Sequence, residues 1–154
     1  MKTRNQRIKF IAGFAVVGLL SFSILLSSCS EEEIAFICSL EATIANDPAV
    51  FDECSYDLNQ QFNFMGFFNA EYSVDFSGFD VDQTGTPQSL GSGGVTSTLF
   101  DNATNTIFFS DSGSVQINQR TEDGFSGTFE AFMKDANGNE MNITNANFSV
   151  PITN

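Results

Sequence analysis

Apolar side chains recur at every second position along most of the chain after residue 60. The segments with this pattern are 62–68, 72–76, 95–100, 106–110, 114–119, 125–134 and 141–152. A period of two is typical of a strand with one buried face. Asp111-Ser112-Gly113 reads as a turn and Asn137-Gly138 as a tight hairpin turn. No connection is long enough for a helical crossover, so the pattern predicts a mainly β domain over residues 59–154, an antiparallel β-sandwich or small barrel of about seven strands.

The segment before this domain has a different pattern. Ile34, Ile37, Cys38 and Leu40 are spaced almost as on one face of a helix, and Asn46-Asp47-Pro48 offers a helix cap followed by a proline. This favours one or two short helices over residues 34–54. We therefore divide the chain into three parts. Residues 1–28 form an N-terminal segment, residues 29–58 form a tether and short helical segment, and residues 59–154 form the β domain.

The first residues resemble a secretory signal. Four of the six basic residues lie before Phe10, and an apolar run then extends to Leu26. This run is at the lower limit of the roughly 17–25 residues that span a bilayer. The sequence Leu26-Ser27-Ser28-Cys29 resembles the lipobox of bacterial lipoproteins, which implies lipid on the Cys29 thiol and cleavage before it. We expect a cleaved signal helix over residues 1–28; the alternative is an uncleaved N-terminal membrane anchor.

An acidic run follows the lipobox directly. Ser30-Glu31-Glu32-Glu33 resembles the export signal that sends lipoproteins of Bacteroidota to the outer face of the outer membrane. The resemblance implies a location in the cell envelope, on the surface of the outer membrane. The alternative is that the run is a solvated acidic spacer.

Two cysteines remain once Cys29 is assigned to lipid. Cys38 and Cys54 form an even pair in an exported chain, and we expect a disulfide between them. Closing a loop of this size stabilises a fold by about 3 kcal/mol in the chain-entropy model. The alternative is two free, buried thiols.

Charge and composition narrow the possible functions. After residue 28 the chain has two basic residues, Arg120 and Lys134, against 19 acidic ones, a formal charge of −17. Such a chain does not suit nucleic acid or anionic lipid, so we expect the lipid anchor to be the membrane contact. The sequence has no His, the commonest general base, and no Trp. We expect a protein that is not an enzyme.

Several side chains are candidate ligands or catalytic groups. Asp80-Val81-Asp82-Gln83-Thr84-Gly85 begins like a calcium loop, although its twelfth position is Gly91 and not glutamate. Asp135, Asn137 and Asn139 offer a second set of oxygens, but a hairpin turn explains them without a metal. We therefore expect no cofactor, with calcium at Asp80 and Asp82 as the alternative. A glycosidase would draw its carboxylate pair from Asp75, Glu122, Asp123 and Glu130.

The C-terminal segment carries a resemblance to a family. Gly124-Phe125-Ser126-Gly127-Thr128-Phe129 leads to Asn137-Gly138 and then to Ile143-Thr144 and Phe148-Ser149-Val150. This looks like the closing β-hairpin of a group of uncharacterised Bacteroidota lipoproteins, except that Ala146-Asn147 stands where those have a glycine. The resemblance implies a β fold and an envelope location, and it implies no activity.

Taken together, these features predict a lipid-anchored envelope lipoprotein whose β domain serves as a binding or structural module. The alternative is a lipocalin-like or calcium-stabilised carrier of a small ligand or glycan, and a carboxylate-based glycosidase comes third. Phe67, Phe68 and Phe79 either form an apolar mouth for such a ligand or fill the core. A glycan, an apolar ligand or another envelope protein are the candidate partners.

Overall fold

The structure, a computed structural model, describes residues 35–59, 62–91 and 93–152, which all belong to one compact unit, Ala35–Asn154. Every regular element in these ranges is a β-strand. The strands are β1 (Ser39–Ile44), β2 (Asp47–Phe51), β3 (Glu53–Asn59), β4 (Phe62–Phe68), β5 (Tyr72–Ser77), β6 (Gln88–Ser89), β7 (Thr96–Asp101), β8 (Thr106–Arg120), β9 (Gly124–Lys134) and β10 (Glu140–Pro151). These ranges contain no helix of the length and apolarity that a bilayer crossing requires.

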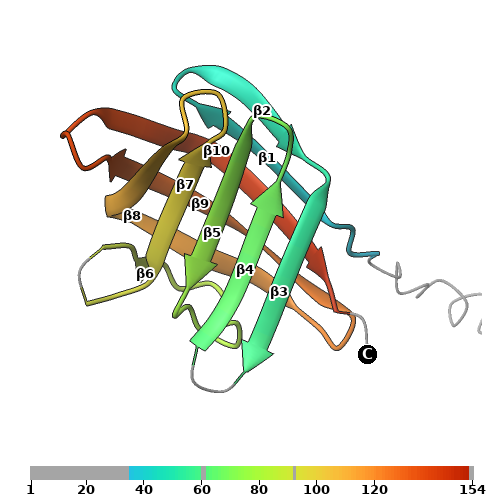
Figure 1. Cartoon of the computed structure of the whole chain (residues 1–154). Coiled ribbons are helices and arrows are strands. Elements are labelled where there is room, and N and C mark those ends of the chain that lie inside the picture. The colour runs from blue at the N-terminus through green and yellow to red at the C-terminus, as the bar shows by residue number, and fades with distance from the viewer. Residues whose placement is uncertain (1–34, 60–61, 92, 153–154) are drawn as a thin grey trace, which may run out of the picture. The chain divides into compact units, whose positions relative to one another are not determined.

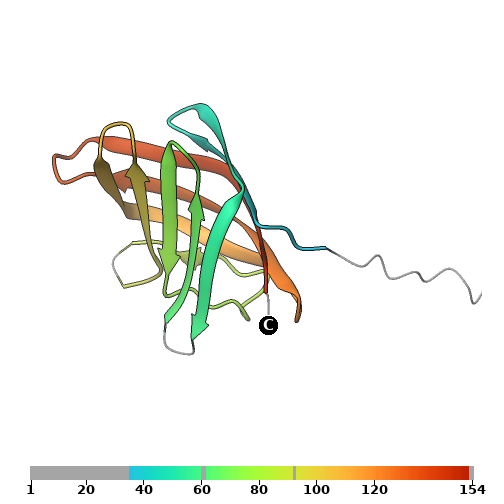
Figure 2. The same cartoon turned by 45° about the vertical axis from the view of Figure 1, so that its right-hand side comes forward.

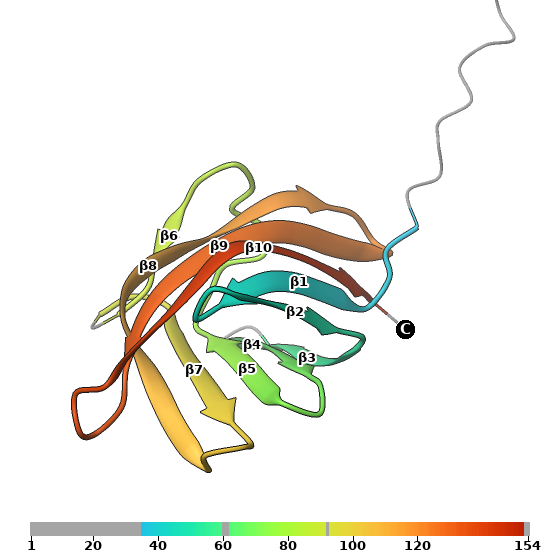
Figure 3. The ribbon, with the colours of Figure 1, turned by 90° about the horizontal axis from the view of Figure 1, so that it is seen from above.

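The strands form one antiparallel sheet that is nearly closed into a barrel (Figures 1 and 3). The order across the sheet is β2-β1-β10-β9-β8-β7-β5-β4-β3, and β6 pairs with β8 beside this path. Its two edge strands, β2 and β3, follow each other in the chain and are separated only by Asp52. The chain therefore turns a corner at Asp52 and leaves one edge of the sheet to form the other.

The core lies between the two halves of the curved sheet. Strands β8, β9 and β10 cross the group formed by β3, β4 and β5 (Figure 2). Aromatic rings from the two halves meet inside: Phe76 and Phe129 at 4.4 Å between ring centroids, and Phe67 and Phe148 at 6.0 Å. These four side chains are at most 4% exposed. Each large aromatic ring buries about 150–250 Å², so these Phe residues supply much of the hydrophobic stabilisation.

Most of the predicted strands are confirmed, and one predicted turn is wrong. The segments 106–110 and 114–119 belong to a single strand, β8, which continues through Asp111-Ser112-Gly113. The register with β9 shifts between Ser110 and Ser112, and Gly113 has a φ of 132°. The turn-like residues thus form a β-bulge, which kinks a strand without ending it. The predicted Asn137-Gly138 turn does join β9 to β10, with Gly138 at a φ of 82°.

The helical segment predicted for residues 34–54 is wrong wherever the structure describes it. Leu40, Ala42 and Ile44 are buried and alternate along β1, so the period is two and not that of a helix. Ala45 and Asn46 have φ values of 52° and 78°, the two positive values that a tight hairpin turn requires. Residues 39–59 therefore belong to the sheet, which has about ten strands and not seven. The predicted signal helix, 1–28, lies outside the described residues.

The predicted disulfide between Cys38 and Cys54 is confirmed, with 5.8 Å between the Cα atoms. Its surroundings differ from the prediction, because it joins strands and not helices. Cys38 directly precedes β1, and Cys54 lies in edge strand β3. The amide Nδ2 of Asn69, in the turn before β5, also donates to the Val50 carbonyl of β2, at 3.0 Å. The disulfide thus joins the start of β1 to edge strand β3, and the Asn69 hydrogen bond joins the β4–β5 turn to edge strand β2.

The glycine-rich connection between β5 and β7 packs on the sheet. Its apolar residues Phe79, Val81 and Leu90 are at most 6% exposed and belong to the core. The short strand β6 pairs with Val115 and Ser114 of β8, and Gln88 exchanges two hydrogen bonds with the backbone of Asp80. Phe79 and Phe67 therefore fill the core and do not form an apolar mouth.

Candidate functional site

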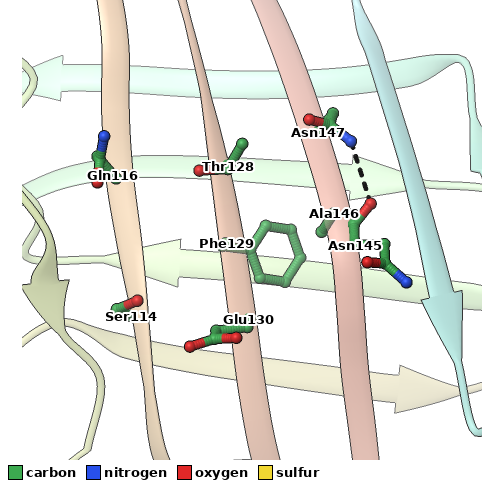
Figure 4. Close-up of a pocket in the computed structure, with 8 residues that line it drawn as sticks. All are labelled: Ser114, Gln116, Thr128, Phe129, Glu130, Asn145, Ala146 and Asn147. Carbon is green, nitrogen blue, oxygen red and sulfur yellow. Dashed lines mark hydrogen bonds between the residues drawn. The ribbon is translucent and has the colours of Figure 1, made fainter. Parts of the chain in front are cut away.

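An open hollow lies on the outer face of β8, β9 and β10. Its volume is about 440 Å³, within the range of roughly 300–1,000 Å³ typical of small-ligand sites. Six polar side chains surround it, two from each strand: Ser114, Gln116, Thr128, Glu130, Asn145 and Asn147. Figure 4 shows them on three neighbouring strands, with strands of the other half of the sheet crossing behind.

Strand alternation places these side chains on the outside. Val115 and Ile117 of β8 and Phe129 and Ala131 of β9 are buried, so the residues between them face solvent. The register then aligns the polar positions, with Gln116 opposite Thr128 and Thr128 opposite Asn147. Since successive strands lie about 4.8 Å apart, this row spans about 10 Å of the surface.

A β-bulge in β10 shapes one wall of the hollow. The register with β9 shifts between Ile143 and Ala146, and Asn145 has a φ of 52°. The bulge puts two consecutive residues, Thr144 and Asn145, on the outside between buried Ile143 and Ala146, and alternation then resumes with Asn147 outside. Bulges re-aim side chains in this way near binding sites. The Nδ2 of Asn147 also donates to the Asn145 carbonyl at 3.1 Å.

The chemistry of the hollow suits a neutral, hydroxyl-rich ligand. Gln116, Asn145 and Asn147 each offer donors and an acceptor, and the Ser114 and Thr128 hydroxyls can do both. Glu130 is the ionisable residue among those that line the hollow. The hollow therefore does not contain the pair of carboxylates that a glycosidase uses.

The four carboxylates considered for a glycosidase lie in different parts of the sheet. Glu130 lines the hollow on β9, whereas Asp75 faces outward on β5, with β7 and β8 between them in the strand order. Glu122 and Asp123 are neighbours in the turn between β8 and β9. The expectation that the protein is not an enzyme stays a prediction.

Asp80 and Asp82, the predicted calcium ligands, take part in local contacts. The Oδ1 of Asp80 accepts from the Asp82 amide at 3.0 Å, and the Oδ1 of Asp82 lies 3.9 Å from Nε of Arg120. Among the described residues, no group of three or more Asp, Glu, Cys or His side chains is arranged to hold a metal ion. Calcium at this loop stays a prediction.

Asp135 caps the hairpin between β9 and β10. Its Oδ1 accepts from the amides of Asn137 and Asn139, each at 2.8 Å. Desolvation raises the pKa of Asp135, but the hydrogen bonds from Asn139 and Asn137 outweigh it, and the pKa is lowered below its usual value. Asp135, Asn137 and Asn139, the candidate oxygen ligands for a metal, therefore form a turn.

The carboxyl of Asp75 has the opposite shift. Burial raises its pKa, and a hydrogen bond with the Thr98 side chain lowers the pKa only in part. Its Oδ1 is buried and has no hydrogen-bond partner. The ionised form is therefore poorly solvated in the folded protein.

We expect Asp75→Asn to raise the free energy of unfolding at pH 7 by about 1 kcal/mol. This value is the low end of the cost of burying an unsatisfied polar group. The low end applies because the site is partly exposed to solvent. The wild-type pKa is higher in the folded than in the unfolded state, so wild-type stability falls as pH rises through the folded pKa. The gain should thus vanish at about pH 2.5, well below the ordinary Asp pKa of 3.8, where Asp75 is protonated in both states. Urea titrations at both pH values test this, with the exposed Glu53→Gln on the same sheet face as control. An equal gain at both pH values would contradict the explanation.

The predicted anchor residues lie outside the described part of the chain. These are the lipobox, Leu26, Ser27, Ser28 and Cys29, and the acidic run Ser30, Glu31, Glu32 and Glu33. The hollow itself was not predicted from the sequence. Alternation does indicate that its residues face outward, but nothing in the sequence indicates which outward residues of different strands become neighbours.

Comparisons with protein-family models, with curated proteins and with solved structures found no match for this chain. The site is therefore interpreted from its own chemistry.

Proposed function

We propose that this protein is a lipid-anchored lipoprotein of the bacterial cell envelope, displayed on the outer-membrane surface, whose β domain binds a hydroxyl-rich ligand such as a glycan. The observation that carries the binding role is the hollow on β8, β9 and β10, which six polar side chains line. The lipobox and the acidic run after Cys29 support the location.

Two observations favour the outer hollow over a lipocalin-like site inside the barrel. Rings from the two halves of the sheet contact each other across the interior, as Phe76 and Phe129 do. The interior positions of Met65, Leu99 and Ile117 are 0% exposed. An apolar ligand inside would have to displace these side chains, at the cost of core packing.

The anchor has a direct test. We expect the protein to take up labelled palmitate in its native bacterium and to be removed from intact cells by added protease. Cys29→Ser should abolish the labelling, because the thiol carries the lipid, whereas Cys54→Ser should keep it. Labelled Cys29→Ser protein would contradict the anchor, and protection of wild-type protein from protease would contradict the surface location.

Binding at the hollow is tested with a panel of neutral oligosaccharides and the full-length protein in detergent. We expect at least one member to bind, and Gln116→Ala and Asn147→Ala each to weaken that binding about tenfold. This is the effect of losing one hydrogen bond worth about 1.4 kcal/mol.

Asn142→Ala is the matched control for these variants. It removes the same amide group from an exposed position of the same strand, but Asn142 does not line the hollow. No binding by any oligosaccharide, or equal weakening by Asn142→Ala, would overturn the proposed site.

A further inference from the structure

The outer face of the other half of the sheet carries a patch of apolar side chains. We define the outer aromatic patch as Phe64, Phe68, Phe100, Ile107 and Phe109, from strands β4, β7 and β8. Ile107 is 48% exposed and Phe109 is 55% exposed, and the other three are half-buried. By contrast, the outer side chains around the hollow, on residues 114–116 of β8 and on the neighbouring parts of β9 and β10, are polar.

The strand register brings these side chains together. Ser73 of β5 lies between Phe68 and Phe100 in the register, and Phe100 is opposite Ile107. In the next row across the sheet, Asp75 of β5 lies between Gly66 and Thr98 in the register, and Thr98 is opposite Phe109. The apolar side chains therefore flank the polar outward residues Ser73 and Asp75 of β5 on both sides. Exposed apolar groups gathered on one face in this way are typical of interaction sites.

A carboxylate lies within the patch. A Cβ atom on Gly66 would lie 2.5 Å from the Oδ1 of Asp75, 2.9 Å from Cζ of Phe68 and 3.3 Å from Cζ of Phe64. The Asp75 carboxylate therefore leans over Gly66, between two phenyl rings, in space that any other residue at position 66 would fill. Its Oδ1 has no hydrogen-bond partner.

The charges around this carboxylate are negative. Glu53 and Asp57 of edge strand β3 are opposite Phe68 and Phe64. The two basic residues of the described chain, Lys134 and Arg120, contact other carboxylates: Lys134 lies 3.2 Å from Asp111, and Arg120 lies beside Asp82. Neither contacts Asp75, so a cation that pairs with it has to come from outside the described residues.

We propose that the outer aromatic patch docks a segment of a partner protein that combines apolar side chains with a Lys or Arg whose charged group reaches Asp75. Phenyl rings and a carboxylate both attract such a cation, the rings through their negative faces. The formal charge of −17 that each chain carries after residue 28 disfavours a second copy as the occupant, and it disfavours an anionic membrane for the same reason.

The test uses the full-length protein in nonionic detergent and three labelled hexapeptides of alternating Leu and Arg, Ser and Arg, or Leu and Glu. After subtraction of the signal from empty micelles, we expect the Leu-Arg peptide to bind at least tenfold more tightly than the other two. Asp75→Asn and Phe109→Ser should each weaken its binding at least tenfold. Both positions are at least partly exposed, and circular dichroism verifies that the variants fold.

The control is Glu122→Gln, which makes the same charge change in the turn between β8 and β9 and should change binding less than twofold. Equal binding of the Ser-Arg peptide, or equal weakening by Glu122→Gln, would show general attraction to an acidic protein and overturn the proposal. So would cross-linking of wild-type protein into dimers that Phe109→Ser abolishes, because a second copy would then occupy the patch. Gln116→Ala, which changes the hollow, should leave peptide binding unchanged, so the two sites are tested independently.

Discussion

Phe76→Ala is expected to lower the free energy of unfolding by about 3–5 kcal/mol, the cost of removing a buried aromatic ring and leaving a cavity. Phe76 is 0% exposed and meets Phe129 edge to face at 4.4 Å between centroids, so the ring joins the two halves of the sheet. Domains of this size have total stabilities of about 5–15 kcal/mol. Urea denaturation followed by circular dichroism measures the loss.

Phe109→Ala is the control for this prediction. It deletes the same ring from the outer face of the sheet, where Phe109 is 55% exposed. We expect a change below about 1 kcal/mol, because surface substitutions have small effects on stability. Equal losses for the two variants would contradict the described division into a buried and an exposed face.

Loss of the Cys38–Cys54 disulfide is the second large effect. We expect the double variant Cys38→Ser/Cys54→Ser to lose about 3 kcal/mol in urea titrations, because the bond closes a loop over a sequence separation of 16 residues. The same loss should follow reduction of the wild-type protein. The reductant should not change the stability of the double variant, and a change there would point to an unrelated effect of the reagent.

The position of the disulfide adds a local expectation. It connects the start of β1 with edge strand β3, the two regions where the sheet ends. We expect exchange of the amide hydrogens of β1, β2 and β3 to be accelerated more strongly by reduction than that of β9, which should be accelerated only by the factor that corresponds to the global loss of about 3 kcal/mol. Exchange of this kind reports local opening free energies. A uniform acceleration over all strands would show that the bond acts on the whole fold.

The two proposed sites share only strand β8, of which they use different segments, and they have different chemistry. The hollow on β8, β9 and β10 is lined by amides, hydroxyls and one carboxylate, whereas the outer aromatic patch on β4, β7 and β8 surrounds Asp75. A tethered envelope module with both could hold a glycan and a protein at once. The predicted stabilisation by Asp75→Asn fits this view, because binding residues are often kept at a cost in stability.

The sequence was a good guide where the local pattern and the final environment agree. In β9, Phe129, Ala131 and Met133 alternate with outward residues and are at most 4% exposed. The cysteine pair was also predictable, because assigning Cys29 to lipid left two partners. The sequence pattern was misleading at residues 34–54. There the near-helical spacing of Ile37, Cys38 and Leu40 overlaps the alternation of Leu40, Ala42 and Ile44, and the alternation is the pattern that the structure follows.

The sequence by itself therefore determined which residues face inward in most strands after residue 60, where most turns there lie and which cysteines pair. Only the tertiary structure decided that the strands form one nearly closed sheet and that β8 continues through a bulge. It also decided which side chains surround the hollow and which surround the Asp75 carboxylate. The reason is that alternation is a local property of one strand, whereas pairing and register join residues far apart in the chain. Gly66 illustrates this: its lack of a side chain has a purpose only because Asp75, on the next strand, leans over it.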